Sequence, residues 1–180
     1  MKRMILAVIL AGAAIAATAE TPSVAQDIRA ADEALAKKVR HELLMLPYLS
    51  VFDNMTFRVE NGDVTLMGQV VRPTLASSAF NVVKRLEGVA HVSNQIEVLP
   101  LSNFDNRVRL SVARAVYGYT ALQRYGLGAN PPIRIIVKNG DVTLEGVVAN
   151  EMDRNLAFMR ANGVAGAFKV TNHLRVDGRA

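Results

Sequence analysis

Histidine is the side chain in this sequence best suited to metal binding or acid–base catalysis, and the chain has three of them. His41, His91 and His173 lie far apart in the chain, and no two share the spacing that places ligands on one helix face. No run of carboxylates accompanies them, and the chain has no cysteine. The sequence therefore predicts no metal site and no disulfide.

Two aspartates, Asp63 and Asp141, recur at equivalent places and are the next candidates for acid–base chemistry. Each directly follows a glycine, a position typical of turn residues, and no partner acid or base is visible. The chain also lacks a nucleophile elbow, a phosphate-binding loop and a paired-carboxylate motif. We therefore expect a non-enzymatic protein without a cofactor.

The N-terminus has the pattern of a secretory signal peptide over residues 1–19. Lys2 and Arg3 precede an apolar run over 5–17, and Ala17-Thr18-Ala19 then offers the small residues that a signal peptidase reads. The run is shorter than the ~20 residues that span a bilayer. Cleavage after Ala25 and an uncleaved anchor are the alternatives. We expect a periplasmic protein without a lipidated cysteine and without a nucleic-acid partner, since aromatic residues for base stacking are also scarce, at 6%.

The chain contains an internal repeat. Residues 60–70 read ENGDVTLMGQV and residues 138–148 read KNGDVTLEGVV, an offset of 78 that continues without a gap to the end of each half. Upstream, one residue of slippage aligns the hydrophobic positions of the first helices, for example Leu35 with Val112. A self-match of this length indicates duplicated units.

The repeat divides the chain near Pro100. The predicted segments are the signal peptide, a flexible polar lead-in over residues 20–30, a first domain over 31–100 and a second over 101–178. Each domain has roughly 75 residues, which is small but sufficient for independent folding. Hydrophobic spacing in each predicts the order helix, strand, strand, helix, strand. The predicted fold class is α+β: two tandem αββαβ units, each a three-stranded sheet with two helices on one face.

Repeated glycines and asparagines have structural interpretations in this scheme. Gly62 and Gly140 suit two-residue hairpin turns, because each follows an asparagine. Gly68 and Gly146 lie on the core-facing register of their strands, which indicates a bulge or a close helix approach.

Asn94 and Asn172 occupy the third strands at positions where the alternation calls for apolar groups. A buried amide needs hydrogen-bond partners, so we expect each to tie its strand to a neighbouring loop. Contact with a polar ligand is the less favoured alternative.

The sequence resembles the BON domain family, named for bacterial osmotically induced periplasmic and nodulation proteins. NGDVTLMGQV with VSNQIEV carries the resemblance in the first unit, and NGDVTLEGVV with VTNHLRV carries it in the second. Two such units behind a signal peptide resemble the dual-BON periplasmic proteins, which include the osmotically induced protein Y group. The resemblance implies a non-enzymatic module that binds phospholipid and supports envelope integrity, with chaperone-like or stress-response roles in some members.

The two units differ in charge and on the outer face of their first helices. Residues 20–100 carry a net charge of −2 and residues 101–180 carry +5. In the second unit the expected core stripe of the first helix is Phe104, Val108, Val112 and Val116. The opposite side carries Leu110 and Tyr117, flanked by Arg107 and Arg114 on one side and by Arg109 on the other.

An apolar strip bordered by arginines suits the interface of an anionic membrane. Arginine binds lipid phosphate bidentately, and tyrosine favours the headgroup level. Arg124, beyond the helix, extends this surface. The sequence thus predicts a reversible phospholipid-binding surface. Packing of Leu110 and Tyr117 against the first unit is an equal alternative for this face. A chaperone-like module that holds envelope proteins or unfolded clients is the alternative function.

Overall fold

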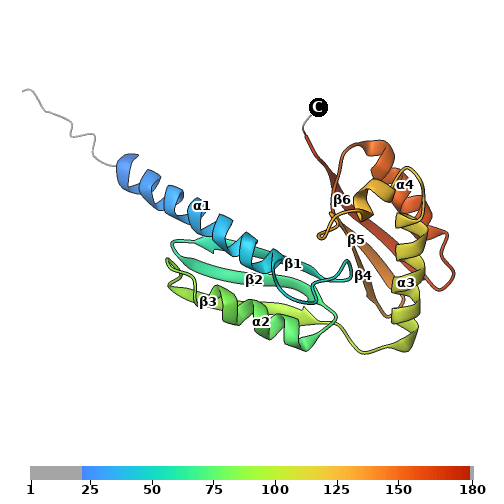
Figure 1. Cartoon of the computed structure of the whole chain (residues 1–180), viewed down its shortest axis with the longest axis horizontal. Coiled ribbons are helices and arrows are strands. Elements are labelled where there is room, and N and C mark those ends of the chain that lie inside the picture. The colour runs from blue at the N-terminus through green and yellow to red at the C-terminus, as the bar shows by residue number, and fades with distance from the viewer. Residues whose placement is uncertain (1–21, 179–180) are drawn as a thin grey trace, which may run out of the picture.

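The computed structural model describes residues 22–178 and shows two successive αββαβ units (Figure 1). The first unit consists of α1 (Pro22–Leu44), β1 (Asn54–Glu60), β2 (Asp63–Val70), α2 (Pro73–Val83) and β3 (His91–Val98). The second consists of α3 (Asn103–Tyr117), the short 3-10 helix η1 (Gln123–Gly126), β4 (Ile133–Lys138), β5 (Asp141–Val148), α4 (Glu151–Asn162) and β6 (Lys169–Val176). The predicted α+β class and tandem architecture are confirmed. The expected signal peptide lies outside the described residues.

Each unit contains one three-stranded sheet whose strands follow chain order. The first two strands form an antiparallel hairpin, with Val59 opposite Val64 in the first unit. The third strand runs parallel to the second, with Val64 opposite Val92 and, in the second unit, Val142 opposite Val170. A parallel neighbour requires a crossover, which α2 and α4 provide. In each unit the first helix and the crossover helix share one buried core with the sheet, so both helices lie on the same face of it.

The two hydrophobic cores form between these helices and sheets. In the first unit, Leu35, Val39 and Leu43 lie four residues apart on α1 and are all buried against the core. A spacing of three or four residues keeps side chains on one face of a helix, as the sequence predicted. Val108 and Val112 repeat this stripe on α3.

An aspartate on each first helix fixes the helix to the hairpin turn of its unit. The Asp32 carboxylate accepts hydrogen bonds from the backbone N–H groups of Asn61 and Gly62, at 2.8 and 3.0 Å. Asp105 accepts the same pair from Asn139 and Gly140, at 3.0 and 2.8 Å. These four backbone groups belong to the two-residue turns that the sequence predicted.

This contact also corrects the alignment of the two first helices. Asp32 corresponds to Asp105, so Leu35 corresponds to Val108 and not to Val112. The expected alignment was wrong by four residues, about one helical turn of 3.6 residues. A shift of one turn preserves a helical hydrophobic pattern, so spacing alone does not distinguish the two registers. The extra residues of the second unit lie between α3 and β4, where η1 forms.

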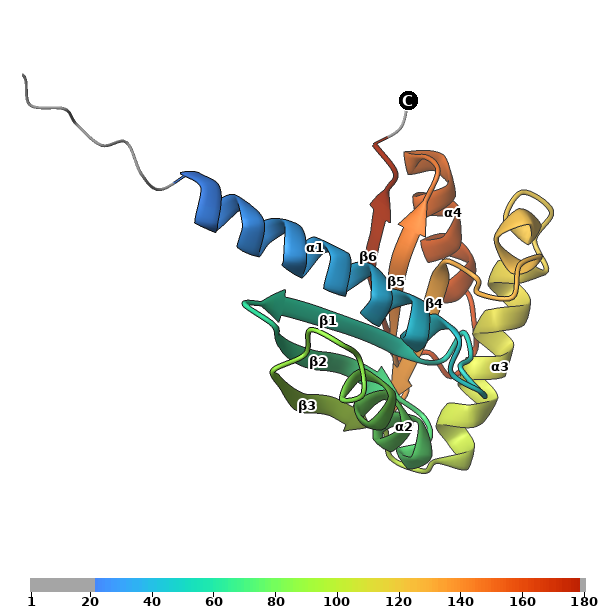
Figure 2. The ribbon, with the colours of Figure 1, turned by 60° about the vertical axis from the view of Figure 1, so that its left-hand side comes forward.

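Helix α1 is longer than the sequence suggested. It begins at Pro22, so residues 22–30 are helical, although a flexible lead-in was expected over 20–30. Proline suits the first turn of a helix, and the alanines that follow favour helix formation. This N-terminal part of α1 extends beyond the sheet of its unit (Figures 1 and 2).

The two units are in contact through the loop that follows α1 (Figure 2). Phe52 of this loop packs against the hydrophobic core of the second unit. The Arg134 guanidinium donates a hydrogen bond to the Ser50 carbonyl at 2.9 Å. Lys138 and Glu97 form an ion pair at 2.6 Å between the two sheets. The units therefore share an interface in addition to their covalent linker.

Candidate functional site

Helix α3 carries five of the six residues that the sequence assigned to a phospholipid-binding surface. The helix begins at a capped end, where the Ser102 hydroxyl accepts a hydrogen bond from the Asp105 N–H at 3.1 Å. Val108, Val112 and Val116 face the core of the second unit. The opposite side of α3 therefore faces outward.

Three residues form an exposed line on this outward side, which we call the α3 stripe: Arg107, Leu110 and Arg114. Their spacings of three and four residues place them on one helix face. Leu110 is 48% exposed. Within residues 22–178, neither guanidinium of the stripe forms an ion pair or a hydrogen bond through its side chain. Both positive charges are thus available to a partner.

Arg109 does not belong to this surface, contrary to the sequence interpretation. Its side chain is only 2% exposed, and its guanidinium donates hydrogen bonds to the Val137 carbonyl at 2.7 Å and to Asn106 Oδ1 at 2.6 Å. Burial lowers the pKa of Arg109, while the carboxylates of Asp105 and Asp53 act in the opposite direction. The side chain of Arg109 therefore points inward toward β4, where the Val137 carbonyl accepts its hydrogen bond.

Tyr117 is also held within the second unit. Its ring packs against the hydrophobic core, and its hydroxyl donates a hydrogen bond to the Ile133 carbonyl at 2.5 Å. Burial raises the pKa of Tyr117, with the nearby Arg134 acting in the opposite direction. The hydroxyl therefore remains protonated and hydrogen-bonded within the protein, so it is not free to contact a lipid headgroup. Of the two residues whose exposure the sequence left open, Leu110 is exposed and Tyr117 is half-buried.

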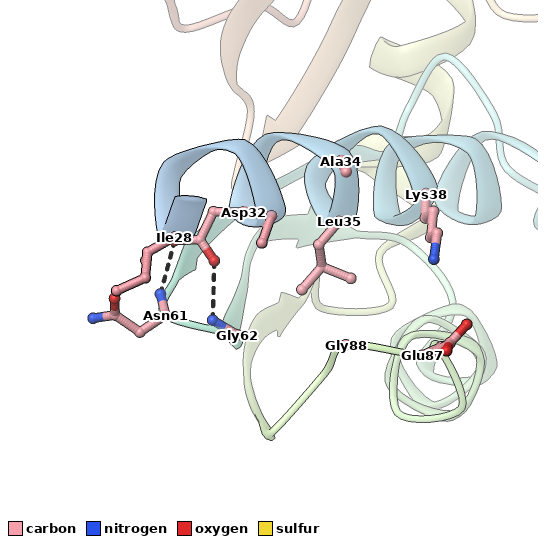
Figure 3. Close-up of a pocket in the computed structure, with 10 residues that line it drawn as sticks. Ile28, Asp32, Ala34, Leu35, Lys38, Asn61, Gly62, Glu87 and Gly88 are labelled. Carbon is pink, nitrogen blue, oxygen red and sulfur yellow. Dashed lines mark hydrogen bonds between the residues drawn. The ribbon is translucent and has the colours of Figure 1, made fainter. Parts of the chain in front are cut away.

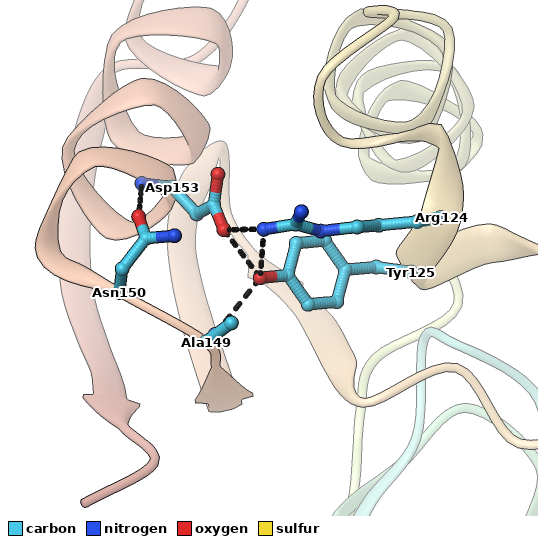
Figure 4. Close-up of polar contacts among 5 residues, drawn as sticks. All are labelled: Arg124, Tyr125, Ala149, Asn150 and Asp153. Carbon is cyan, nitrogen blue, oxygen red and sulfur yellow. Dashed lines mark hydrogen bonds and ion pairs between the residues drawn. The ribbon is translucent and has the colours of Figure 1, made fainter. Parts of the chain in front are cut away.

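Arg124 of η1 takes part in a polar cluster with residues at the start of α4 (Figure 4). It forms an ion pair with Asp153, and it donates a hydrogen bond to the Tyr125 hydroxyl at 3.2 Å. The Tyr125 hydroxyl donates to Asp153 at 2.5 Å and accepts from the Ala149 N–H at 2.8 Å. Hydrogen bonds to Tyr125 and Asp153 raise the pKa of Arg124.

This cluster attaches the loop to the first turn of α4. Asp153 belongs to that turn, where its N–H donates to Asn150 Oδ1 at 2.8 Å. A carboxylate in the first turn is favoured by the helix dipole. No sequence signal predicts the connection between the segments of Asn150 and Tyr125, because the two are 25 residues apart and share no pattern. The positive charge of Arg124 is therefore paired with Asp153 within the protein.

Gly68 and Gly146 allow a close approach between neighbouring strands. Their φ angles are +110° and +118°. A Cβ atom at Gly68 would lie 2.0 Å from the Asn54 carbonyl oxygen, and one at Gly146 would lie 1.8 Å from the Pro132 oxygen. The close neighbour is thus the backbone at the start of β1 or β4, and not a helix as one of the alternatives proposed.

Asn94 and Asn172 connect the third strand of each unit to its second helix. Asn94 Nδ2 donates to the Ala76 carbonyl at 3.2 Å, and Asn172 Nδ2 donates to the Arg154 carbonyl at 3.1 Å. Each Oδ1 atom accepts the backbone N–H two residues later, at 3.1 Å. Each asparagine thus forms the expected hydrogen bond to a neighbouring segment, but that segment is a helix and not a loop. Asn94 is also exposed, although a buried amide was expected.

The histidines are placed on separate surfaces. His91 Nδ1 lies 3.2 Å from Asp63, and His173 Nδ1 lies 2.7 Å from Glu145, each across neighbouring strands. His41 lies on the exposed side of α1. Among residues 22–178, no three histidine or carboxylate side chains are grouped as metal ligands would be.

The duplicated αββαβ unit defines a class of tandem α+β proteins. The chain belongs to the BON domain family: the family's sequence profile, described as BON domain, matches residues 31–100 and 119–178. BON domains are binding modules without a catalytic role, and the family is associated with membrane-related and phospholipid-related functions. Proteins with this domain are often periplasmic.

Comparison with curated proteins finds no match. Among solved structures, the chain is similar to the C-terminal domain of CdsD, a structural protein of the type III secretion system of Chlamydia trachomatis. The identity is 15% and the TM-score 0.29, over 79% of this chain and 97% of that one. A second CdsD structure matches at 14% identity with a TM-score of 0.29, over 81% and 94%. A likeness at this level adds nothing to the functional argument.

No helix between residues 22 and 178 combines the length and the apolar character that crossing a bilayer requires.

Proposed function

We propose that this protein binds reversibly to anionic phospholipid surfaces through the α3 stripe. The observation that supports this is the exposed Leu110 between Arg107 and Arg114, whose guanidinium groups have no partner among the described residues. Arginine forms paired hydrogen bonds with phosphate, and an exposed leucine can enter the headgroup boundary.

The expected affinity follows from the number of free charges. Each basic residue near an anionic membrane contributes about 1 kcal/mol, and the attraction decays within a Debye length. Arg109 and Arg124 are among the lipid-binding residues that the sequence predicts. However, Arg109 is buried and Arg124 is paired with Asp153. Two free arginines and one leucine give weak binding that salt weakens further.

Liposome co-sedimentation tests this proposal. The wild type is compared with Arg107→Glu/Arg114→Glu on vesicles with and without phosphatidylglycerol. The matched control is Lys37→Glu/Arg40→Glu, which makes the same change in net charge on exposed positions of α1. We expect wild type and control to sediment with phosphatidylglycerol vesicles and the α3 variant to remain in solution. Equal binding by all three proteins, or no binding by wild type, contradicts the proposal.

A periplasmic location and a role in envelope integrity under stress belong to the same proposal. They are supported by the signal-peptide pattern and by the family, and the dual-BON group with osmotically induced protein Y is the expected counterpart. Cell fractionation with an epitope-tagged protein tests the location. Recovery of the full-length tagged protein with the cytoplasm, with its leader intact, contradicts it.

A second candidate function, a chaperone-like protein-interaction module, is supported by α4. Met152 and Met159 are 78% and 60% exposed, and their spacing of seven residues places them on one helix face. Exposed methionines suit surfaces that accept varied apolar partners. Suppressed aggregation of an unfolded client, unaffected by salt and lost in Met152→Ser/Met159→Ser, supports this function. Unchanged suppression by that variant contradicts it.

A further inference from the structure

The first unit contains an open groove at one end of its sheet (Figure 3). The groove lies between α1, the β1–β2 turn and the loop that precedes β3, and its volume is about 640 Å³. Its inner wall is formed by Ala31 and Leu35 of α1 and by Gly62 and Gly88 of the turn and loop. Glu87 lies at its edge.

In the second unit two phenylalanine rings fill the equivalent place. Phe104 and Phe168 stack with ring centroids 5.4 Å apart. They cover the glycines that correspond to Gly62 and Gly88: a Cβ atom on Gly140 would lie 2.5 Å from Phe168, and one on Gly166 would lie 3.5 Å from Phe104.

The first unit has alanines where the second has these rings. In the register fixed by Asp32 and Asp105, Ala31 corresponds to Phe104, and the offset of the strands pairs Ala90 with Phe168. A Cβ atom on Gly88 would meet only the Leu35 side chain, at 4.0 Å. The first unit therefore has the same glycine-lined hollow, which we call the cradle, but no aromatic rings fill it.

One of these two rings is also exposed to solvent. Although Phe168 stacks on Phe104 and lies over Gly140, it is 73% exposed, and Lys169 follows it. The unit that carries it has a net charge of +5, whereas the unit with the groove has −2. Glu87 at the groove edge is exposed and has no ion-pair partner among residues 22–178. Asp32 and Lys38 also line the groove, so its charged side chains carry one net negative charge. The apolar character and the charge of the groove are thus complementary to Phe168 and Lys169.

From this complementarity we propose that the groove of one molecule binds Phe168 of a second copy, with Lys169 near Glu87. Such a contact joins two different surfaces and is therefore heterologous. A dimer formed in this way keeps an empty groove on one molecule and an unbound Phe168 on the other. Association therefore extends into short chains as concentration increases. This contact does not involve the α3 stripe and does not depend on lipid binding.

Sedimentation velocity over a concentration series that reaches millimolar protein tests the contact. In Ala31→Phe/Ala90→Phe, the first unit receives the residues that fill the cradle in the second unit, so we expect the concentration-dependent increase in mass to be lost. The matched control Ala30→Phe adds a ring to α1 at an exposed position outside the groove, and it should associate like wild type. Circular dichroism verifies that each variant is folded.

A mixing experiment keeps the proposal testable if one variant is perturbed. Phe168→Ala introduces the alanine of the first unit and leaves the groove intact, so alone it should remain monomeric. Mixed with Ala31→Phe/Ala90→Phe, which retains Phe168, it should form a one-to-one dimer and nothing larger.

The proposal is overturned by a monomeric wild type throughout the series, by unchanged association after the groove is filled, or by association of Phe168→Ala alone. A synthetic peptide with the sequence of residues 164–171 gives a further test. If a wild type that does not self-associate binds this peptide, the groove takes another polypeptide and not a second copy, and the proposal is contradicted.

Discussion

The backbone N–H of Ile135 donates a hydrogen bond to the carbonyl of Val51, 2.8 Å away in the other unit. The first unit thereby adds a short segment beside β4 of the second. Phe52 follows directly and packs into the second core. The two BON units are therefore connected by a backbone hydrogen bond and a partly buried ring, and we expect them to influence one another's stability.

Replacing Phe52 with alanine should destabilise the second unit by about 2 kcal/mol, roughly half the cost for a fully buried ring, because Phe52 is half-buried. Urea unfolding monitored by circular dichroism measures the change. Tyr48→Ala is the control, since Tyr48 lies in the same loop and is 75% exposed. An equal loss in both variants would show that the ring of Phe52 has no special role between the units.

Asp105→Ala should cost about 3 kcal/mol, because it leaves two backbone N–H groups of the hairpin turn without their charged acceptor. The same change at Asp32 should cost less, about 1 kcal/mol, because that turn is more exposed to water. Chemical denaturation of the two variants measures the difference. A larger effect at Asp32 than at Asp105 would contradict this ranking.

Gly146→Ala should destabilise the protein by at least about 3 kcal/mol, since the residue has φ of +118° and a Cβ atom would overlap the Pro132 carbonyl. Gly178→Ala is the matched control, because no atom lies within 4 Å of the added Cβ. The control should change stability by less than about 0.5 kcal/mol. Thermal unfolding compares the two, and a folded Gly146→Ala with the wild-type melting temperature would refute the close strand approach.

Stability at alkaline pH should depend on Tyr117. Burial raises the pKa of this phenol above its ordinary value of about 10, so its contribution is fully present below that pH and is lost as the pH rises further. Tyr117→Phe should cost about 1 kcal/mol at neutral pH, because the Ile133 carbonyl loses its donor. Between about pH 10 and 12 the difference between the two proteins should shrink. Denaturation at several pH values checks this, and a constant difference would contradict it.

Much of the fold was predictable because hydrophobic spacing and turn residues are local signals. The order of elements, the hairpin glycines and the stripe of Leu35 and Val39 all follow from residues close in sequence. The register between the two first helices was not predictable, because a helical hydrophobic pattern repeats almost unchanged after one turn. The contact that fixes it joins Asp32 to a turn 30 residues away.

The candidate site was predictable only in part. A helical wheel gives the direction of Arg107, Arg109 and Tyr117 around α3, but it does not show which neighbouring segment reaches each side chain. β4 supplies carbonyl acceptors to Arg109 and Tyr117, and these contacts remove both from the surface. The groove was also invisible in the sequence, because it depends on small residues opposite rings that only the correct helix register aligns.

The projecting start of α1 has a mechanical consequence. Residues 22–30 add roughly 13 Å of helix, at 1.5 Å per residue, beyond the Asp32 contact that fixes α1 to its hairpin. A helix transmits position and angle, whereas a flexible tether only limits distance. The N-terminal end of α1 at Pro22 is therefore held at a set distance and direction from the first sheet.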